Sequence, residues 1–230
     1  MQKKEEILES FKTAIKSTVK SISNKDDIEI SFGGQDISVE NNKLNLPEIS
    51  EFQNKINFGL TRALADSESL RLRYSNKKIF KNFEPSGSKA KKLYEIAEKI
   101  RFELLGTEEY IGIKENLLNF YSKQSPPQNK QENIYFAFEN YLRKEFFEIN
   151  NELYKERIST KYKKSFDKVF KMKINKIREN IDKQEIFNAI ISKLLEKLEI
   201  DETSDYEEID NKKDDEKNKE MSNKDETDQK

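Results

Sequence analysis

The run Leu60-Thr61-Arg62-Ala63-Leu64-Ala65-Asp66-Ser67-Glu68-Ser69-Leu70-Arg71-Leu72 opens the segment that decides the fold of this 230-residue chain. Its apolar side chains recur at steps of three and four residues, the spacing of one face of an α-helix. Pro85-Ser86-Gly87 follows as a turn, and a second run with helical spacing extends from Leu93 to Leu104. The segment 60–117 therefore predicts two long helices joined by a turn, with Gly106 ending the second in a left-handed conformation.

The first of these helices is expected to start well before Leu60. Ser50 has an N-cap side chain, and Gln53 three residues later completes a capping box. Phe52 and Ile56 then extend the apolar face toward Leu60. The sequence thus predicts one continuous helix that begins at Ser50.

The amino-terminal part predicts a helix followed by a small β element. Apolar side chains at helical spacing mark residues 4–23. Ile28, Ile30 and Phe32 then alternate with polar residues, the period of two that is typical of a half-buried strand. A second extended piece is expected at 43–46, so we predict a hairpin-like β element near residues 28–46.

The carboxyl-terminal half is predicted to contain further helices. Because Pro126-Pro127 cannot continue a helix, residues 124–131 are interpreted as a linker. It separates a helical domain, residues 1–123, from a helical subdomain, residues 132–200, with helices expected from Ile134 to Phe146 and near residues 183–199. Residues 201–230 have too few apolar side chains to bury, and we predict a disordered acidic tail there.

Composition favours a mainly α-helical fold. Only 34% of residues are hydrophobic and 38% are charged, while the chain has 6 glycines and 4 prolines. Scarce turn residues argue against a β-sandwich and favour long helices with solvated faces. We therefore predict a multi-helix bundle.

Residue types that are missing exclude several classes of function. The chain has no histidine and no cysteine, which removes the usual acid/base group near neutral pH, the commonest metal ligand and all thiolate chemistry. No glycine is followed by lysine, as a phosphate-binding loop of the ATPase type requires. The amino terminus has acidic residues in place of an apolar signal core, and no run is long enough to span a membrane. We expect a cytoplasmic protein that is not catalytic by itself and binds no cofactor or metal.

Charge is divided unevenly along the chain. Residues 201–230 carry a net charge of −7, and residues 1–200 carry a net charge of +6. Residues 155–178 alone hold ten Lys or Arg against two acids, with aromatic side chains at helical spacing. Three interpretations are open: a solvated helix face, a docking surface for an acidic protein or the chain's own tail, and a nucleic-acid or membrane contact. A solvated face over an aromatic core is preferred.

Six charged residues of the central segment are candidates for a functional role. Glu98 and Arg101 lie one turn apart on a helix whose other face is apolar, with Glu103 close behind. They are interpreted as structural ion pairs, as an inter-helix clamp to charged residues of the preceding helix, or as contacts to a partner subunit or its substrate. The six are Arg62, Asp66, Arg71, Glu98, Arg101 and Glu103.

The same segment resembles the amino-terminal region of CobT, a subunit of aerobic cobaltochelatase. The family pattern is roughly Thr-Arg-Gly-x-x-Asp-x-x-Ala-Leu-Arg-Leu, then Pro-x-Gly, then Glu-x-x-Arg-x-Glu-x-x-Gly. In this chain it falls on residues 61–72, 85–87 and 98–106, and Leu46-Pro47-Glu48 matches a Leu-Pro-Glu of the family. The resemblance covers most of residues 5–200.

The resemblance implies a part in the ATP-dependent insertion of cobalt into hydrogenobyrinic acid a,c-diamide during cobalamin biosynthesis. The implied partners are the AAA+ ATPase subunit CobS and the large subunit CobN, in an oligomeric ring, and the complex uses ATP, magnesium and cobalt. This chain would be the helical platform between them. Family members continue through an acidic linker into a von Willebrand A domain, whereas this chain stops inside what resembles that linker, so we expect a fragment or a split gene.

One position departs from the family pattern. Where the family has His-Asp or His-Asn after Arg-Leu, this chain has Ser75-Asn76, and a further expected histidine is missing. The departure favours a structural role for this region. The alternative to a cobaltochelatase subunit is a stand-alone helical module that binds an acidic partner or nucleic acid through residues 155–178, nucleic acid and membranes being the less favoured partners.

Overall fold

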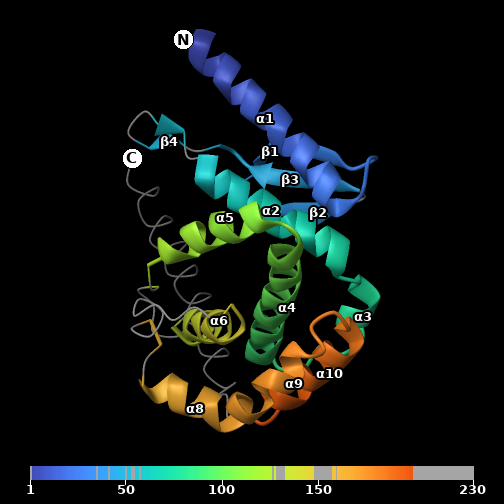
Figure 1. Ribbon diagram of the computed structural model, residues 1–230, viewed down its shortest axis with the longest axis vertical. Helices are drawn as coiled ribbons and strands as arrows, with labels where there is room; N and C mark the ends of the chain where they lie inside the picture. Colours follow the sequence, from blue (N-terminus) through green and yellow to red (C-terminus); the bar gives the residue numbers. More distant parts are fainter. Residues whose placement is uncertain are drawn as a thin grey trace, which may run out of the picture.

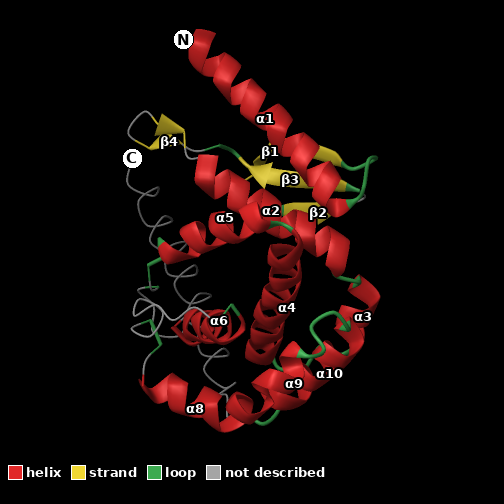
Figure 2. Ribbon diagram, viewed as in Figure 1, coloured by secondary structure: helices red, strands yellow, loops and turns green. Residues whose placement is uncertain are grey.

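Helix α4 (Ser88–Glu109) runs through the middle of the structure, and helices from both halves of the chain pack against it (Figure 1). The computed structural model describes residues 2–34, 36–40, 42–49, 51–52, 55–56, 58–125, 127, 133–147, 157–158 and 160–198. Most of these residues are helical, and a small sheet lies near the amino terminus (Figure 2). The predicted mainly α-helical fold is therefore confirmed. Most of the predicted linker and all of the predicted tail lie outside the described residues.

The amino-terminal helix and the sheet form one end of the molecule (Figure 1). α1 (Gln2–Ser23) packs against α2 (Phe58–Tyr74), and strands β1 (Glu29–Gly34), β2 (Ser38–Glu40) and β3 (Lys43–Pro47) are ordered β1-β3-β2. The hairpin is formed by β2 and β3, which are antiparallel. β1, which we expected to pair with β3 as a hairpin, joins it in parallel. The short β2 reverses the chain once more than predicted, so β3 runs in the direction of β1.

The predicted start of α2 at Ser50 is wrong. Residues Glu51–Phe52 (β4) and Lys55–Ile56 (β5) form a short antiparallel pair, and the helix begins at Phe58. Aromatic and β-branched side chains favour a strand in this stretch. The Phe58 ring packs on Phe11 of α1 with 4.4 Å between the ring centroids, so α2 starts where α1 offers an apolar partner. The capping box itself falls on residues outside the described ones.

Gly106 lies inside α4 and does not end it, contrary to the prediction. The helix continues to Glu109, and among the glycines that the structure describes only Gly33 has a positive φ. A Cβ at position 106 would lie 2.2 Å from Cδ2 of Leu70 on α2. Glycine is therefore needed here because α2 and α4 approach closely, and a turn plays no part.

The remaining elements are helices around α4, and those predicted in the carboxyl-terminal half are confirmed. They are α3 (Lys77–Asn82), α5 (Ile111–Ser122), α6 (Asn133–Phe146), α8 (Thr160–Phe170), the 3-10 helix η1 (Lys171–Lys173), α9 (Ile174–Arg178) and α10 (Gln184–Leu195). From Thr160 onward, the basic segment thus forms α8, η1 and α9. Its Phe166 and Phe170 pack on Phe138 of α6 with centroid distances of 5.3 and 5.4 Å. The aromatic stripe belongs to the core, as interpreted.

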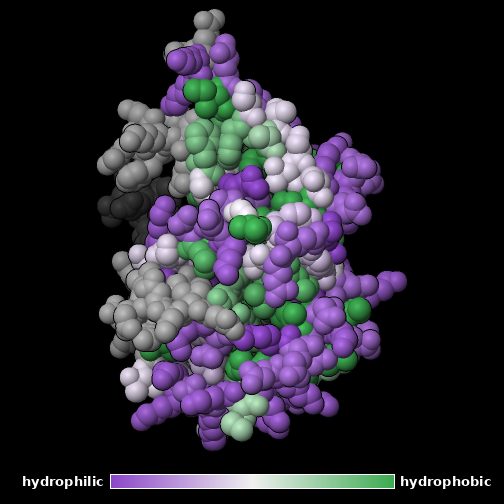
Figure 3. Space-filling model, in the orientation of Figure 1, coloured by the Kyte–Doolittle hydropathy of each residue, from purple (hydrophilic) through white to green (hydrophobic). Residues whose placement is uncertain are grey.

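Three hydrophobic cores hold these elements together. The largest is shared by α4, α6, α8, α9 and α10, a second lies between α1, the sheet and α2, and a third joins α2, α4 and α5. The largest core draws on both sides of the predicted linker. Outside the cores, the face seen in Figure 3 is mainly hydrophilic. None of the described helices has the length and apolar character that crossing a membrane demands.

Candidate functional site

Four of the six predicted site residues place their charges in the interior. Asp66, Glu98, Arg101 and Glu103 are each at most 3% exposed, and they lie on α2 and α4. A charge is tolerated in such a position only where an ion pair and further hydrogen bonds replace the lost water. The partners of these four side chains therefore define the site.

Glu98 and Arg101 form an ion pair inside the molecule. Nε and Nη2 of Arg101 each donate to the Glu98 carboxylate at 2.8 Å. The same guanidinium donates to the carbonyl oxygen of Tyr74 at 2.6 Å and to that of Ile181 at 3.2 Å. Arg101 thereby ties the carboxyl end of α2 and the turn before α10 to α4.

Three neutral side chains complete the surroundings of Glu98. Ser75, Gln184 and Asn188 donate to its carboxylate at 2.7, 3.0 and 3.2 Å. Gln184 also accepts from the backbone N–H of Asn76 at 2.8 Å and donates to the carbonyl oxygen of Asn76 at 3.2 Å. This group holds α10 against α4 and against the start of α3. The Glu98 cluster consists of Glu98, Arg101, Ser75, Gln184 and Asn188.

Ser75 and Asn76, which stand where the resemblance led us to expect a histidine, both have structural contacts. Besides the bond from Ser75 to Glu98, Asn76 caps α3, because its side-chain oxygen accepts from the backbone N–H groups of Lys78 and Ile79 at 2.9 and 3.3 Å. Serine and asparagine supply no group that titrates near neutral pH. Both residues of the turn between α2 and α3 therefore stabilise the packing of helices.

Glu103 is bound on another side of α4. Arg143 of α6 donates to its Oε2 at 2.7 Å, while Ser67 and Tyr121 donate to its Oε1 at 2.6 and 2.7 Å. The Arg143 guanidinium also lies over the Tyr121 ring, 3.4 Å from the centroid. Glu103, Arg143, Ser67 and Tyr121 form the Glu103 cluster, which joins α2, α4, α5 and α6.

A second carboxylate supports Arg143 in this cluster. Glu139 lies 2.7 Å from Arg143, and Lys99 approaches the same carboxylate at 3.7 Å. Burial alone would raise the pKa of Glu139, but the two cations outweigh it and hold the pKa below its ordinary value. Burial also raises the pKa of the Tyr121 phenol. At neutral pH, Glu139 is therefore an anion and Tyr121 a neutral donor.

Asp66 forms a third, smaller group on α2. Its carboxylate accepts from Arg62 at 2.7 Å and from Asn116 of α5 at 3.0 Å. Burial raises the pKa of Asp66, against the opposing effect of these two partners. Arg71 is not brought into any of these groups, because it pairs with Glu68 at 2.6 Å and its side chain is 42% exposed.

The inter-helix clamp has partners other than those expected. Glu98 and Arg101 bind α10 and residues 74–76, and Glu103 binds Arg143, whereas we expected the charged residues of α2. Sequence reasoning missed the partner residues on α6 and α10. A signal was present, since each is a polar residue on the apolar face of its helix. They are Arg143, Gln184 and Asn188.

The three groups place their charges between helices. Asp66, Glu98 and Glu103 each have an arginine and at least one neutral donor, and each of these arginines lies on the same helix or on a packed neighbour. Within the described ranges, no three His, Cys, Asp or Glu side chains are arranged to hold a metal ion. The arrangement can fix helices relative to one another, and the Ser67 and Ser75 hydroxyls within it donate to carboxylates that also bind arginine.

Comparison with models of protein families gives a match over nearly the whole chain. The family model described as "Cobalamin biosynthesis protein CobT" matches residues 5–230 of the chain. No solved structure matches.

Proposed function

The chain belongs to the CobT family of cobalamin biosynthesis proteins, and from this premise we propose that it is a non-catalytic platform in a cobaltochelatase. In the proposed complex, the AAA+ ATPase subunit CobS hydrolyses ATP with magnesium, and the large subunit CobN carries the tetrapyrrole. Cobalt and hydrogenobyrinic acid a,c-diamide are the substrates. This chain passes the nucleotide-driven motion of an oligomeric ring to the large subunit.

The burial of charge around α4 carries this proposal. The ion-paired residues of the Glu98 and Glu103 clusters are at most 3% exposed, so a substrate in solution cannot reach them. All of them bond to neighbouring helices, and hydrogen-bonded networks of this kind make an interior rigid. A subunit that transmits movement needs such rigidity, and it needs no reactive group of its own.

Capture of CobS by the immobilised full chain tests the platform role. We expect retention at micromolar concentration, to a different extent with ATP, with ADP and without nucleotide, because the ring changes shape during its cycle. The heat-denatured chain on the same support is the matched control. Absence of retention under all three nucleotide conditions contradicts the proposal.

A second experiment tests the non-catalytic part separately. The purified chain, without companions, is incubated with ATP and magnesium, and then with cobalt and the corrinoid substrate. We expect neither release of phosphate nor the absorbance change of metal insertion. Either activity in the isolated chain rules out a purely structural role.

The alternative, a stand-alone interaction module, is favoured by one observation. The lysines of α8, η1 and α9 are exposed, as a charged docking surface requires. Retention of a short DNA duplex in place of CobS, lost on raising the salt concentration, supports this alternative.

A further inference from the structure

The carboxyl-terminal helices present a surface with strong positive charge. Residues 160–198 contain ten lysines and one arginine against five acids. All ten lysines are exposed. Like charges crowded on one surface repel one another, and an acidic partner relieves this repulsion. We call the exposed side of α8, η1, α9 and α10 the basic surface.

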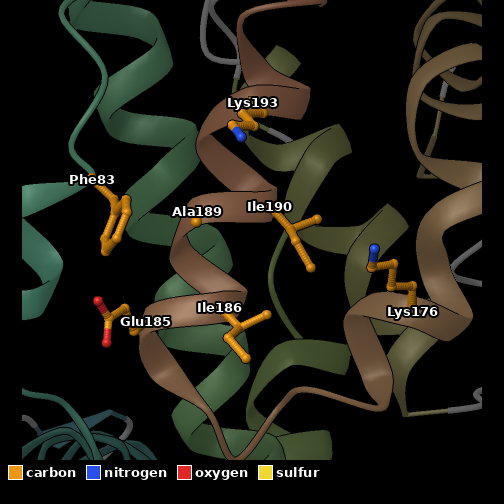
Figure 4. Close-up of a pocket in the computed structure, with 7 residues that line it drawn as sticks. All are labelled: Phe83, Lys176, Glu185, Ile186, Ala189, Ile190 and Lys193. Atoms are coloured by element: carbon orange, nitrogen blue, oxygen red, sulfur yellow. The ribbon is translucent and has the colours of Figure 1, made fainter.

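An apolar groove lies within the basic surface. It has a volume of about 390 Å³. Ile186 and Ile190 of α10 extend toward α9, where Lys176 lies, while Lys193 lies farther along α10 and Glu185 on the opposite side (Figure 4). Ile186 is 43% exposed, although isoleucine side chains are usually buried. The groove thus combines two aliphatic side chains with two lysines at its edge. Its lining is Phe83, Lys176, Glu185, Ile186, Ala189, Ile190 and Lys193.

The residues that follow α10 have the complementary composition. Residues 201–210, which lie outside the described ranges, contain six acids and no Lys or Arg. Within them, Tyr206 and Ile209 are the apolar side chains, and the remainder of the chain to residue 230 adds only Met221. An acidic segment with two large apolar residues matches an aliphatic groove edged by lysines.

The segment can reach the groove. From Leu198 to Tyr206 an extended chain spans up to about 26 Å at 3.3 Å per residue. Measured back along α10, which ends at Leu195, and the turn that follows it, the distance from Leu198 to Ile186 is about 18 Å at roughly 1.5 Å per residue. Because the segment is covalently attached, its effective concentration at the groove is in the millimolar range, which favours it over a partner in solution.

We propose that residues 201–210 dock on the groove of the basic surface. Tyr206 and Ile209 cover Ile186 and Ile190, and the flanking carboxylates lie beside Lys176 and Lys193. Nucleic acid suits this groove less well, because its phosphates would bind the lysines and leave the exposed Ile186 uncovered. The inference is independent of the role in a cobaltochelatase.

Methyl NMR of the full chain with labelled isoleucine tests the apolar contact. We expect the δ-methyl signals of Ile186 and Ile190 to shift in the variant Tyr206→Ser/Ile209→Ser, while the signal of Ile30 in the distant sheet stays in place. Met221→Ser is the matched control and leaves all these signals unchanged. Identical Ile186 and Ile190 signals in the wild type and the double variant overturn the proposal.

A nitroxide tests the charged contact. The chain has no cysteine, so Asn211→Cys gives a single attachment point for the probe. We expect the probe to broaden the Ile190 signal, and the broadening to be lost in Lys176→Glu/Lys193→Glu but kept in Lys161→Glu/Lys164→Glu, which has the same net charge. It is also expected to weaken in about 1 M salt, where the Debye length falls to about 3 Å. Equal broadening in the two charge variants counts against the groove as the binding site.

Two further samples identify a different occupant. In a mixture of isotope-labelled chain without nitroxide and unlabelled chain with nitroxide, we expect no broadening of Ile190. Broadening in that mixture assigns the groove to a second copy and overturns docking within one chain. A short DNA duplex that shifts Ile186 and Ile190 equally in the wild type and in Tyr206→Ser/Ile209→Ser assigns the surface to nucleic acid, with the same consequence.

Discussion

At the scale of single residues, burying the charges of α4 costs free energy, and their bonding partners are needed to offset this cost. Arg101 is 1% exposed and Glu98 is 3% exposed. Removing one member of such a pair leaves the other charge buried without compensation. An exposed pair loses little in the same experiment, because water replaces the missing partner.

Arg101→Ala is expected to lower the free energy of unfolding by about 3 to 5 kcal/mol. The matched control is Arg71→Ala, which removes an arginine from the surface pair with Glu68 and is expected to cost about 0.2 to 1 kcal/mol. Urea unfolding followed by circular dichroism measures both. Equal losses for the two variants would show that the Glu98 cluster adds no more stability than a surface ion pair.

Gly106→Ala is expected to destabilise the protein by about 1 to 3 kcal/mol, because the new methyl group overlaps Leu70 in a packed interior. Gly112→Ala on α5 is the control: its Cβ meets open space, and a gain of up to about 1 kcal/mol is expected. In a Leu70→Ala background the effect of Gly106→Ala should largely disappear. A cost that persists in that background points to a cause other than the contact with Leu70.

Two carboxylates are expected to show opposite pH dependence. The pKa of Asp66 is raised above its ordinary 3.8, chiefly by burial, so the folded state holds this proton more tightly than the unfolded state. Its contribution to stability is therefore greatest below pH 3.8 and declines as the pH rises through the raised pKa. The pKa of Glu109 is lowered from 4.5, chiefly by the hydrogen bond from the Tyr74 hydroxyl, so its contribution is present above 4.5 and is lost as the pH falls through the lowered pKa.

The measurement is the difference in free energy of unfolding between the wild type and Asp66→Asn, and between the wild type and Glu109→Gln, across the acid range. As the pH rises, the wild type should lose stability relative to Asp66→Asn. Over the same range, it should gain stability relative to Glu109→Gln. Two differences with the same slope would be incompatible with this assignment.

At this scale, the sequence indicated which charges matter and could not indicate their partners. Glu98 and Arg101 could be named as candidates from the sequence, because they are charged residues on a helix whose other face is apolar. Gln184 and Asn188, however, are far along the chain, and only the packing of α10 on α4 brings them to Glu98. Contacts between such distant segments depend on the crossing of helices, which periodicity does not specify.

At the scale of elements, one polar side chain of α10 binds two other helices at once. Gln184, the first residue of α10, bonds to Glu98 of α4 and to the backbone of Asn76 at the start of α3. No other single residue described for the Glu98 cluster reaches both of these helices through its side chain. The ends of α3 and α10 should therefore loosen together.

Gln184→Ala is expected to increase amide hydrogen exchange in α3 and at the amino end of α10, while α5 keeps its wild-type protection. Glu185→Ala, the exposed neighbour, is the control and should leave all three helices unchanged. If hydrogen exchange rises in α10 alone, the bonds from Gln184 to Asn76 do not stabilise α3.

The helices around α4 were predictable because their apolar faces follow a period of 3.6 residues over several turns. The start of α2 was not, because Phe52 and Ile56 fit a helix face and a short strand equally well, and a local pairing decided between them. The parallel pairing of β1 with β3 could not be predicted either. Two strands at 28–32 and 43–46 indicate a hairpin unless the short strand β2 between them is recognised.

At the scale of the whole molecule, the cores overlap through α2 and α4. α4 contributes to the largest core and to the one it shares with α2 and α5, while α2 also reaches the core under the sheet. The loss of any one core exposes side chains of a helix that another core needs. Unfolding of the described body is therefore expected to be cooperative.

Far-ultraviolet and tyrosine near-ultraviolet circular dichroism should report one coincident transition in urea. The chain has 9 tyrosines and no tryptophan, so the near-ultraviolet signal reports the tyrosines of the cores. Two separate transitions would instead support an independent subdomain beyond the predicted linker at 124–131, whose division of the chain stays a prediction.

The placement of Glu98 and Glu103 limits how α4 can move. They are five positions apart in the sequence, which sets them about 140° apart around the helix axis. Because α4 is bonded on two sides, it cannot rotate about its axis or shift along it without breaking hydrogen bonds to both α10 and α6. In the proposed complex, we therefore expect a force on α10 to tilt α4 as a rigid rod, with little rotation of the helix about its own axis.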